Sequence, residues 1–249
     1  MVKILNKLSE KRHFIVSKNN IINNSFILEG SEAHHAINVT RVLINEEIYL
    51  IDKKGCLYTA IIKKIYNSLV EGIIVDIEKN YNESRIKIEL GISLLKGSKL
   101  DLVVEKCTEL GVHSITPLIT EHSILKKVNV NRLIKKAEVA IKQCGRGLLP
   151  EINEAIPLND WFDKFSSKFI IVLDQNDSNN SLKKILSKNK IQDVILVIGP
   201  EGGFSKKELM NFKTRKVKFA NLGTRRLKAE TAAILSTGLI DHFVHEDKF

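Results

Sequence analysis

Cysteine is scarce in this sequence, and the few cysteines lie far apart. Cys56, Cys107 and Cys144 are odd in number and form no Cys-x-x-Cys pair, which argues against a disulfide framework and against a zinc site. We therefore expect ordinary packed cysteines and no bound metal. No run of 18 or more apolar residues occurs, and residues 1–11 lack the apolar core of a secretory signal. We expect a cytoplasmic protein without a membrane span.

Negative charge is also in short supply. Lys and Arg number 39 against 29 Asp and Glu, which gives a formal net charge of +10. This excess favours a polyanionic partner, because basic side chains that neutralise phosphates release bound counterions. Residue usage alone can also make a lysine-rich protein basic. With 249 residues and 43% hydrophobic content, the chain can form one large or two modest packed domains.

Short segments with a period of two fill the first 77 residues and predict a small β-barrel. The strands are expected at 13–16, 47–51, 57–62 and 70–77. Residues 52–55 (DKKG) predict a hairpin loop in which the glycine takes positive φ. Between the first two strands, Ser31 is expected to cap a short helix that carries a pair of histidines.

After a polar joint at 80–84 the hydrophobic period changes from two to 3.6, and strands alternate with helices. This pattern predicts an α/β domain at residues 78–249. The strands are expected at 86–94, 114–120, 168–174, 194–198 and 217–222, and the helices after Ser98, at 132–144, at 182–188, after Ser205 and at 229–244. The aliphatic run at 194–198 is typical of a parallel strand that is buried on both faces.

A glycine-rich loop follows that aliphatic strand. Residues 198–204 read IGPEGGF, and Ser205 with Glu208 has the form of a capping box that starts a helix. Such a loop exposes bare backbone to a ligand, at the place where open α/β sheets bind ligands. It contains neither Gly-x-Gly-x-x-Gly nor a phosphate-loop pattern. A tight turn without a ligand is the alternative interpretation.

A second run follows the next expected strand, where residues 222–232 read LGTRRLKAETA. The two runs together resemble the signature of the SPOUT superfamily, and specifically of the small-subunit (16S) ribosomal RNA uridine-N3 methyltransferases. That family has a GPEGG loop followed by a Leu-Gly-x-Arg-(apolar)-Leu-Arg-x-Glu-Thr-Ala run. The chain departs at Arg226, where the family usually has an apolar residue, and at Lys228, where it usually has Arg. Matches also occur at 96–99, 106–111 and 143–146.

This resemblance implies a trefoil-knotted α/β domain of the SPOUT type, with the knot at 170–245, preceded by a PUA-like β-barrel that grips RNA. It implies S-adenosyl-L-methionine as the cofactor and a two-fold homodimer. It also implies ribosomal RNA as the substrate, either as naked RNA or within the assembled small subunit. The residues expected at the cofactor are Leu173, Ile198, Gly199, Pro200, Gly202, Gly203, Leu222, Gly223 and Leu227. The residues expected to contact RNA are Arg12, His34, His35, Arg41, Lys96, Lys99, Arg225 and Arg226.

The chemistry of such a reaction identifies candidate catalytic residues. Uridine N3 must lose a proton before it attacks a methyl carbon, and a nearby cation would stabilise the resulting anion. Arg146 is the first candidate, because it lies at the exit of an expected helix in a run that the family shares. Glu201 or Glu230 could position this arginine or accept the proton. Each also has a structural interpretation: Glu201 could hold loop amides, and Glu230 could cap its helix.

Other functions remain open from the sequence. A SPOUT enzyme that methylates a different RNA position would share every cofactor motif. A non-catalytic RNA-binding protein would have the barrel and the basic surface but no affinity for S-adenosylmethionine. His34 and His35, taken singly, are also compatible with surface or packed histidines. A dinucleotide oxidoreductase is disfavoured, because the fingerprint glycines are absent.

Overall fold

A computed structural model of the chain describes residues 12–123, 125, 127–165, 169–175, 180–188, 191, 193–215 and 217–246. Contacts divide the chain into two units, Met1–Glu83 with Ile141–Leu149 and Ser84–Ala140 with Pro150–Phe249. This division differs from the expected linear boundary at residue 77, because Ile141–Leu149 bonds back to the first unit: Gly147 N–H donates to the Tyr81 carbonyl at 3.1 Å. Residues 1–11 and Lys168, the expected start of a strand, lie outside the described residues.

A six-stranded sheet forms the first unit, in the order β1-β4-β5-β6-β3-β2. Strand β1 pairs with β4 in parallel, and the other neighbours are antiparallel. The elements are β1 (His13–Ile15), η1 (Lys18–Asn20), β2 (Ile21–Ile22), β3 (Ser25–Leu28), α2 (Gly30–His34), η2 (His35–Val39), β4 (Glu47–Ile51), β5 (Cys56–Ile65) and β6 (Val70–Lys79).

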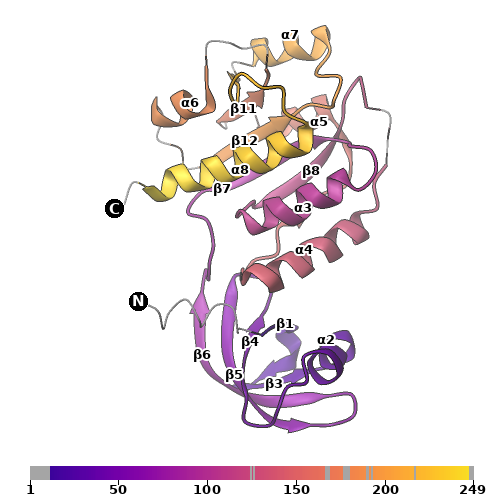
Figure 1. Cartoon of the computed structure of the whole chain (residues 1–249), viewed down its shortest axis with the longest axis vertical. Helices are drawn as coiled ribbons and strands as arrows, with labels where there is room; N and C mark the ends of the chain where they lie inside the picture. The colour runs from indigo at the N-terminus through magenta and orange to yellow at the C-terminus, as the bar shows by residue number, and fades with distance from the viewer. Residues whose placement is uncertain are drawn as a thin grey trace. The chain divides into compact units, whose positions relative to one another are not determined.

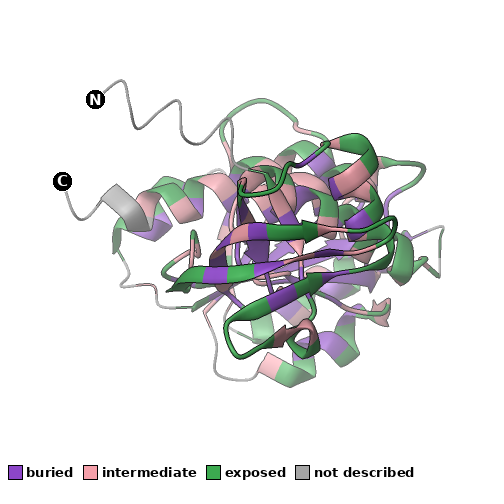
Figure 2. Ribbon diagram, turned by 90° about the horizontal axis from the view of Figure 1, so that it is seen from below, coloured by how far each residue is buried: buried purple, intermediate pink, exposed green. Residues whose placement is uncertain are grey.

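Alternating side chains give this first sheet one packed face and one exposed face. Phe26 and Leu28 are buried in the core whereas Ile27 between them is exposed, and Figure 2 shows this alternation along the strands. Ile73 and Val75 of β6 are also exposed. Whether the sheet closes into a barrel stays a prediction.

The second unit contains a parallel sheet in the order β10-β8-β7-β12-β11-β13, with β9 paired to β8. Figure 1 shows helices packed against it. The elements are β7 (Lys87–Ser93), α3 (Lys99–Glu109), β8 (Ser114–Ile119), α4 (Val130–Cys144, whose last turn belongs to the first unit), β9 (Glu151–Ile152), β10 (Ile156–Pro157), α5 (Leu158–Phe162), η3 (Asp163–Phe165), β11 (Ile170–Leu173), α6 (Leu182–Lys188), β12 (Asp193–Ile198), α7 (Lys206–Thr214), β13 (Lys218–Ala220) and α8 (Ala229–Glu246).

Both faces of the parallel sheet are covered. Helix α8 packs on α3 and reaches the central strands β7 and β12, while Trp161 of α5 and Phe212 of α7 join a core cluster with β11 and β12. Gly91 in β7 makes room for this second layer, because a Cβ there would lie 2.4 Å from the Trp161 ring. The burial of β12 over five consecutive residues follows from this two-sided packing.

Several local predictions were tested by the structure. The capping box at Ser205 and Glu208 is confirmed, and so is positive φ at Gly55, which is 101°. Ser31 as a helix cap is wrong: the N-cap of α2 is Glu29, two residues earlier, and no side chain caps the helix. Ser98 is the N-cap residue of α3, but its hydroxyl makes no capping hydrogen bond. The short elements β2, β3, β9, β10 and α5 were not predicted.

Candidate active site

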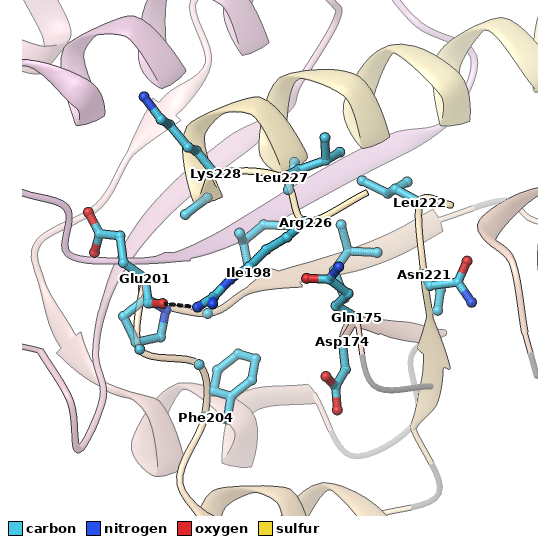
Figure 3. Close-up of a pocket in the computed structure, with 18 of the residues that line it drawn as sticks. Asp174, Gln175, Ile198, Glu201, Phe204, Asn221, Leu222, Arg226, Leu227 and Lys228 are labelled. Carbon is cyan, nitrogen blue, oxygen red and sulfur yellow. Dashed lines mark hydrogen bonds between the residues drawn. The ribbon is translucent and has the colours of Figure 1, made fainter. Parts of the chain in front are cut away.

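One pocket of about 720 Å³ lies at the carboxyl ends of β11, β12 and β13. The loop after β12 and the loop after β13 meet there, as Figure 3 shows. Parallel strands that end at one edge of a sheet bring together loops that are distant in sequence, which is why this edge collects ligands. The pocket therefore arises from the topology of the second unit.

The first wall is the glycine loop after β12. Gly199 is required because a Cβ at this residue would lie 2.9 Å from the Phe204 ring. Gly203 has a φ of 73°, and its N–H donates to the Pro200 carbonyl at 2.8 Å. The loop then enters α7 through Ser205, whose amide donates to the Glu208 carboxylate at 2.8 Å. Local bonds thus fix the turn at residues 200–203 and the entry of the loop into α7.

The loop after β13 forms the opposite wall. Gly223 has a φ of 110°, and its N–H donates to Oδ1 of Asn221 at 3.1 Å. The backbone N–H of Asn221 donates in turn to the backbone carbonyl of Asn180 at 2.9 Å, which holds Asn221 in place. A Cβ at Gly223 or at Gly203 would meet no atom within 4 Å. The absence of side chains at these two glycines therefore leaves bare backbone at the pocket surface.

The structure brings every predicted cofactor residue to this one pocket. Leu173, Ile198, Gly199, Pro200, Gly202, Gly203, Leu222, Gly223 and Leu227 all line it. The sequence reading missed other lining residues, among them Asp174, Gln175, Phe204 and Asn221 (Figure 3). Their position in the sequence was the available signal, since Asp174 and Asn221 directly follow strands, Gln175 is next to Asp174, and Phe204 follows Gly203.

His122 is a further residue that the sequence reading missed. It follows β8, and its Nδ1 lies 3.0 Å from the Gly203 carbonyl oxygen. A carbonyl can only accept, so the proton of this bond is on Nδ1. The neighbouring Glu121 amide donates to the Glu208 carboxylate at 2.9 Å. The loop after β8 therefore supports the glycine loop from outside the pocket lining.

Two charged residues of the pocket have fixed partners. The Glu201 carboxylate accepts a hydrogen bond from Lys99 Nζ at 2.6 Å, and this bond holds the pKa of Glu201 below its ordinary value. The same bond raises the pKa of Lys99. The Arg226 guanidinium donates from Nη2 to the backbone carbonyl of Glu201 at 3.2 Å. Glu201 thus links a cation of α3 to the loop after β13.

Glu230, the other carboxylate candidate, lies outside the pocket lining. It occupies the first turn of α8 and is 8% exposed. Its Oε2 atom is buried and has no hydrogen-bond partner within the part of the chain that the structure describes. A buried carboxylate oxygen without a partner is costly. The catalytic role of Glu230 stays a prediction.

Arg146, the predicted cation, is placed in the first unit and does not line the pocket. Its side chain is 3% exposed, and Nη2 lies 2.6 Å from Oε2 of Glu83. Oε1 of the same carboxylate accepts the Leu148 amide at 2.8 Å. This ion pair binds the returning segment Ile141–Leu149 to the end of the first unit. A catalytic role for Arg146 stays a prediction.

The remaining RNA candidates fall into two groups. In the first unit, Arg12 forms an ion pair with Glu46 at 2.8 Å, His34 and Arg41 are exposed, and His35 is partly buried. In the second unit, Lys96 is exposed, while Arg225 and Arg226 are exposed and line the pocket.

The pocket chemistry suits an organic ligand that carries a nucleoside. Ile198, Leu222 and Leu227 supply apolar walls, and the glycine loops supply backbone donors and acceptors. Within the described ranges, no group of three or more His, Cys, Asp or Glu side chains is arranged to hold a metal ion. Of the helices described, none combines the length and the apolar character that a membrane crossing requires.

Comparison with known proteins defines the class to which this fold and pocket belong. Residues 82–241 match the family model described as an RNA methyltransferase domain. Ribosomal RNA small subunit methyltransferase E of Rickettsia conorii is 31% identical over 87% of this chain and 92% of its own length. The chain belongs to the ribosomal RNA small subunit methyltransferase E family.

Solved structures agree with this assignment. The crystal structure of ribosomal RNA small subunit methyltransferase E from Neisseria gonorrhoeae, bound to S-adenosyl methionine, has a TM-score of 0.85 and 27% identity, and the match covers 94% of this chain and 98% of that one. A putative methyltransferase from Legionella pneumophila, in complex with the cofactor SAM, has a TM-score of 0.82 and 26% identity over the same shares of the two chains.

Proposed function

We propose that this protein methylates N3 of a specific uridine in small-subunit ribosomal RNA with S-adenosyl-L-methionine as the methyl donor. The observation that carries the proposal is the single pocket in which both glycine loops meet. A methyltransferase of the same family and a structurally similar putative methyltransferase were solved with this cofactor. A related enzyme that modifies another RNA position would use the same pocket, so the choice of atom rests on the sequence resemblance.

The residues present fit this cofactor. Leu222 and Leu227 would flank the adenine, and the backbone next to Gly199 and Gly223 would bond its edge. The bare backbone at Gly203 would allow close approach. When bound, the cofactor supplies an electrophilic methyl group. The chain contributes alignment of the reacting atoms, which is the main catalytic effect in an in-line displacement.

Glu201 is suited to positioning rather than to proton transfer. Its bond to Lys99 lowers its pKa, and a carboxylate with a lowered pKa is a weaker proton acceptor at neutral pH. We propose that the Lys99–Glu201 pair fixes the glycine loop over the methyl donor. Catalytic roles for Glu230 and Arg146 stay predictions, which substitution of each residue can test.

We propose that the second unit contains the trefoil knot. Strand β13 pairs with β11, whereas the helix that follows it, α8, packs against α3 and the central strands β7 and β12. The connection at residues 221–228 must therefore pass back over β11 to reach the sheet centre. A passage of this kind supports the threading that the resemblance implies.

The first unit is proposed as an RNA-binding, PUA-like barrel. Its support is the exposed basic group with His34 and Arg41. Phosphate contacts by such side chains would make RNA affinity fall steeply as salt rises. RNA binding measured for Arg41→Gln between low and high salt tests this: an unchanged salt dependence would remove Arg41 from the interface.

A two-fold homodimer is proposed for α8. Ala233, Thr237 and Ile240 face the interior with 0% exposure, whereas Leu235 and Leu239 on another face are each 41% exposed. A two-fold contact would cover this apolar face in both copies. Mixing an Arg146→Ala chain with a Gly203→Val chain tests whether sites are shared between copies. A fully active protein that sediments as a monomer would overturn the dimer.

Substitution of a pocket glycine tests the cofactor site. Gly203→Val introduces a branched side chain at positive φ and at the pocket surface. Gly97→Val is the matched control, because Gly97 also has positive φ with nothing within 4 Å, yet it does not line the pocket. Calorimetry should show loss of S-adenosylmethionine binding for Gly203→Val alone. Equal binding of S-adenosylmethionine by both folded variants would show that the cofactor does not bind in this pocket.

Mapping of modified uridines tests the substrate. Ribosomal RNA from cells that lack this protein should have lost one methyl group at N3 of a small-subunit uridine. Expression of the parent chain should restore it, and Gly203→Val should not. Loss of a methyl group at another atom would support the related SPOUT activity instead, and unchanged RNA would favour a binding protein.

A further inference from the structure

A second hollow lies on the β13 side of the parallel sheet, and the proposed reaction makes no use of it. It has a volume of about 290 Å³ and lies between helix α6 and strand β13, the last strand in the order of the described sheet. Its volume is less than half that of the cofactor pocket, which is about 720 Å³. The second hollow therefore suits part of a larger ligand better than a second cofactor.

The charge of the second hollow is of one sign. Lys184, Lys188 and Lys218 line it, and none of the lining residues that the structure describes is acidic. Lys184 and Lys188 lie four residues apart on α6, so their side chains leave the helix on the same face. All three lysines are exposed. Like charges around one hollow repel each other, and an anion bound between them would remove this repulsion.

The rest of the wall is mainly apolar. Ile185 is buried in α6, while Val217 and Phe219 are partly buried against a core cluster. The Phe219 ring is braced by Phe212, with 6.2 Å between the ring centroids. Apolar and aromatic side chains are the surfaces on which a ribose or a base packs without regard to sequence. The hollow thus combines cations for a phosphate with an apolar wall for the nucleoside attached to it.

One hydrogen bond joins the walls of the two hollows. The Asn221 N–H donates to the Asn180 carbonyl at 2.9 Å. Asn221, labelled in Figure 3, lines the cofactor pocket, and Asn180 lines the second hollow. Along the chain, Lys218 and Asn221 are separated by about 10 Å at the rise of a strand. An RNA strand with its target base at the cofactor pocket would therefore bring a neighbouring phosphate within reach of the lysines.

We infer that the second hollow binds a phosphate of the substrate RNA next to the target uridine. The inference rests on the proposed function and adds three lysines that the family motifs do not include. The ligand is a phosphodiester, whose oxygens accept hydrogen bonds from the lysine ammonium groups. Contacts of this kind fix the register of a nucleic acid and carry no sequence information. The lysines hold the RNA strand and do not touch the reacting atoms.

The experiment compares two triple variants of the whole chain. One variant removes the charges of the hollow: Lys184→Gln, Lys188→Gln and Lys218→Gln. The control variant removes three exposed lysines of the same unit that line neither hollow, one of them on α6: Lys87→Gln, Lys183→Gln and Lys213→Gln. Affinity is measured across a range of salt concentrations for a small-subunit ribosomal RNA transcript and for unmethylated small subunits. Calorimetry without RNA gives the affinity for S-adenosylmethionine.

The hollow variant should bind RNA more weakly than the parent and the control. Its plot of log affinity against log salt concentration should be shallower by about 1 for each lysine–phosphate contact that is lost. In methylation of small subunits its KM for RNA should rise while kcat stays parental, because the lysines hold the strand only. Its affinity for S-adenosylmethionine should also stay parental. The control variant should change the salt dependence and KM much less.

A lysine footprint locates the contact in the parent protein. Acetylation by acetic anhydride, measured by mass spectrometry, should show that the bound transcript protects Lys184, Lys188 and Lys218 but not Lys183. Inorganic phosphate is the comparison ligand. Equal protection by phosphate at the same phosphate concentration would assign the hollow to a free anion and overturn the inference. Protection by assembled subunits but not by the transcript would assign it to a ribosomal protein and overturn it as well.

The inference is also overturned if the hollow variant and the control have the same RNA affinity and salt dependence, or if the hollow variant loses cofactor affinity in parallel. These outcomes are distinct from failure of the proposed function. A parent protein that transfers no methyl group to uridine N3 overturns the proposed function, while the footprint and the salt dependence still decide whether the hollow binds RNA. An active parent whose three lysines stay unprotected overturns the assignment of the hollow alone.

Discussion

The two units use β-sheet structure in different ways. The first sheet is largely antiparallel and leaves Ile27, Ile73 and Val75 exposed on one face. The second sheet is parallel, and helices cover it on both faces. The parallel sheet ends three of its strands at one edge, where the pocket lies. An antiparallel meander alternates its strand ends and so offers a surface rather than a cleft.

The two units also differ in the exposure of their ion pairs. The Glu83–Arg146 pair is buried in the first unit, with side-chain exposures of 14% and 3%. The Lys99–Glu201 pair at the pocket has exposures of 36% and 44%. A buried pair is costly to break, whereas an exposed pair mainly fixes geometry. We therefore expect the first pair to matter for stability and the second for the site.

The largest expected effect is on the buried pair. Glu83→Gln removes the charge that lies 2.6 Å from the buried Arg146 guanidinium, so the free energy of unfolding of the first unit should fall by about 3–5 kcal/mol. Urea denaturation combined with hydrogen exchange measures this loss. The double variant Glu83→Leu with Arg146→Met removes both charges and should lose much less. If Glu83→Gln is as stable as the parent, the expectation that the buried pair matters for stability is wrong.

The two sheets should differ next in their tolerance of side-chain volume. Gly91→Ala places a Cβ 2.4 Å from the Trp161 ring, and overpacking of this kind costs about 1–3 kcal/mol. Ile73→Thr, on the exposed face of the first sheet, should change stability by no more than about 0.5 kcal/mol. Thermal or urea unfolding of both variants checks the difference, and equal losses would contradict it.

Helix caps within the second unit give a smaller effect. Ser205→Ala removes the hydroxyl that accepts from the Glu208 amide at 3.2 Å, so the free energy of unfolding should fall by about 1 kcal/mol. Ser98 is a natural control, since it occupies the N-cap of α3 without a capping hydrogen bond. Ser98→Ala should therefore cost less. Equal costs for the two variants in urea unfolding would mean that the box contributes nothing.

The smallest effect concerns the exposed pair. Lys99 lowers the pKa of Glu201. The Lys99–Glu201 pair therefore stabilises the fold fully above the ordinary pKa of a glutamate, and this stabilisation is lost as pH falls through the lowered pKa of Glu201. Lys99→Met should raise the Glu201 pKa toward its ordinary value, as an NMR titration of that side chain would show. Lys106→Met is the control, because Lys106 pairs with Glu105 and Glu109. A Glu201 pKa unmoved by Lys99→Met would show that the bond does not form in solution.

Local chemistry explains which elements the sequence predicted well. Helix α6 was expected at 182–188 and spans Leu182–Lys188, and the box at Ser205 lies where its residue types require. Such signals depend on neighbours within one turn. Strands β2 and β3 and helix α5 escaped prediction because they are two to five residues long. Strand β2 pairs with β3, β3 pairs with β6, and α5 packs through Trp161; the local sequence contains none of these contacts.

The sequence by itself determined the two glycine loops, the strands before them and the family to which they belong. Parallel strands share an edge, so the meeting of both loops in one pocket also followed from the pattern. Only the tertiary structure decided that Arg146 lies outside that pocket while Arg226 lines it. Arg146 and Arg226 carry the same charge, but Glu83 buries the first in another unit, while the carbonyl of Glu201 anchors the second across the pocket. Partners distant in sequence set this difference, and no local pattern encodes them.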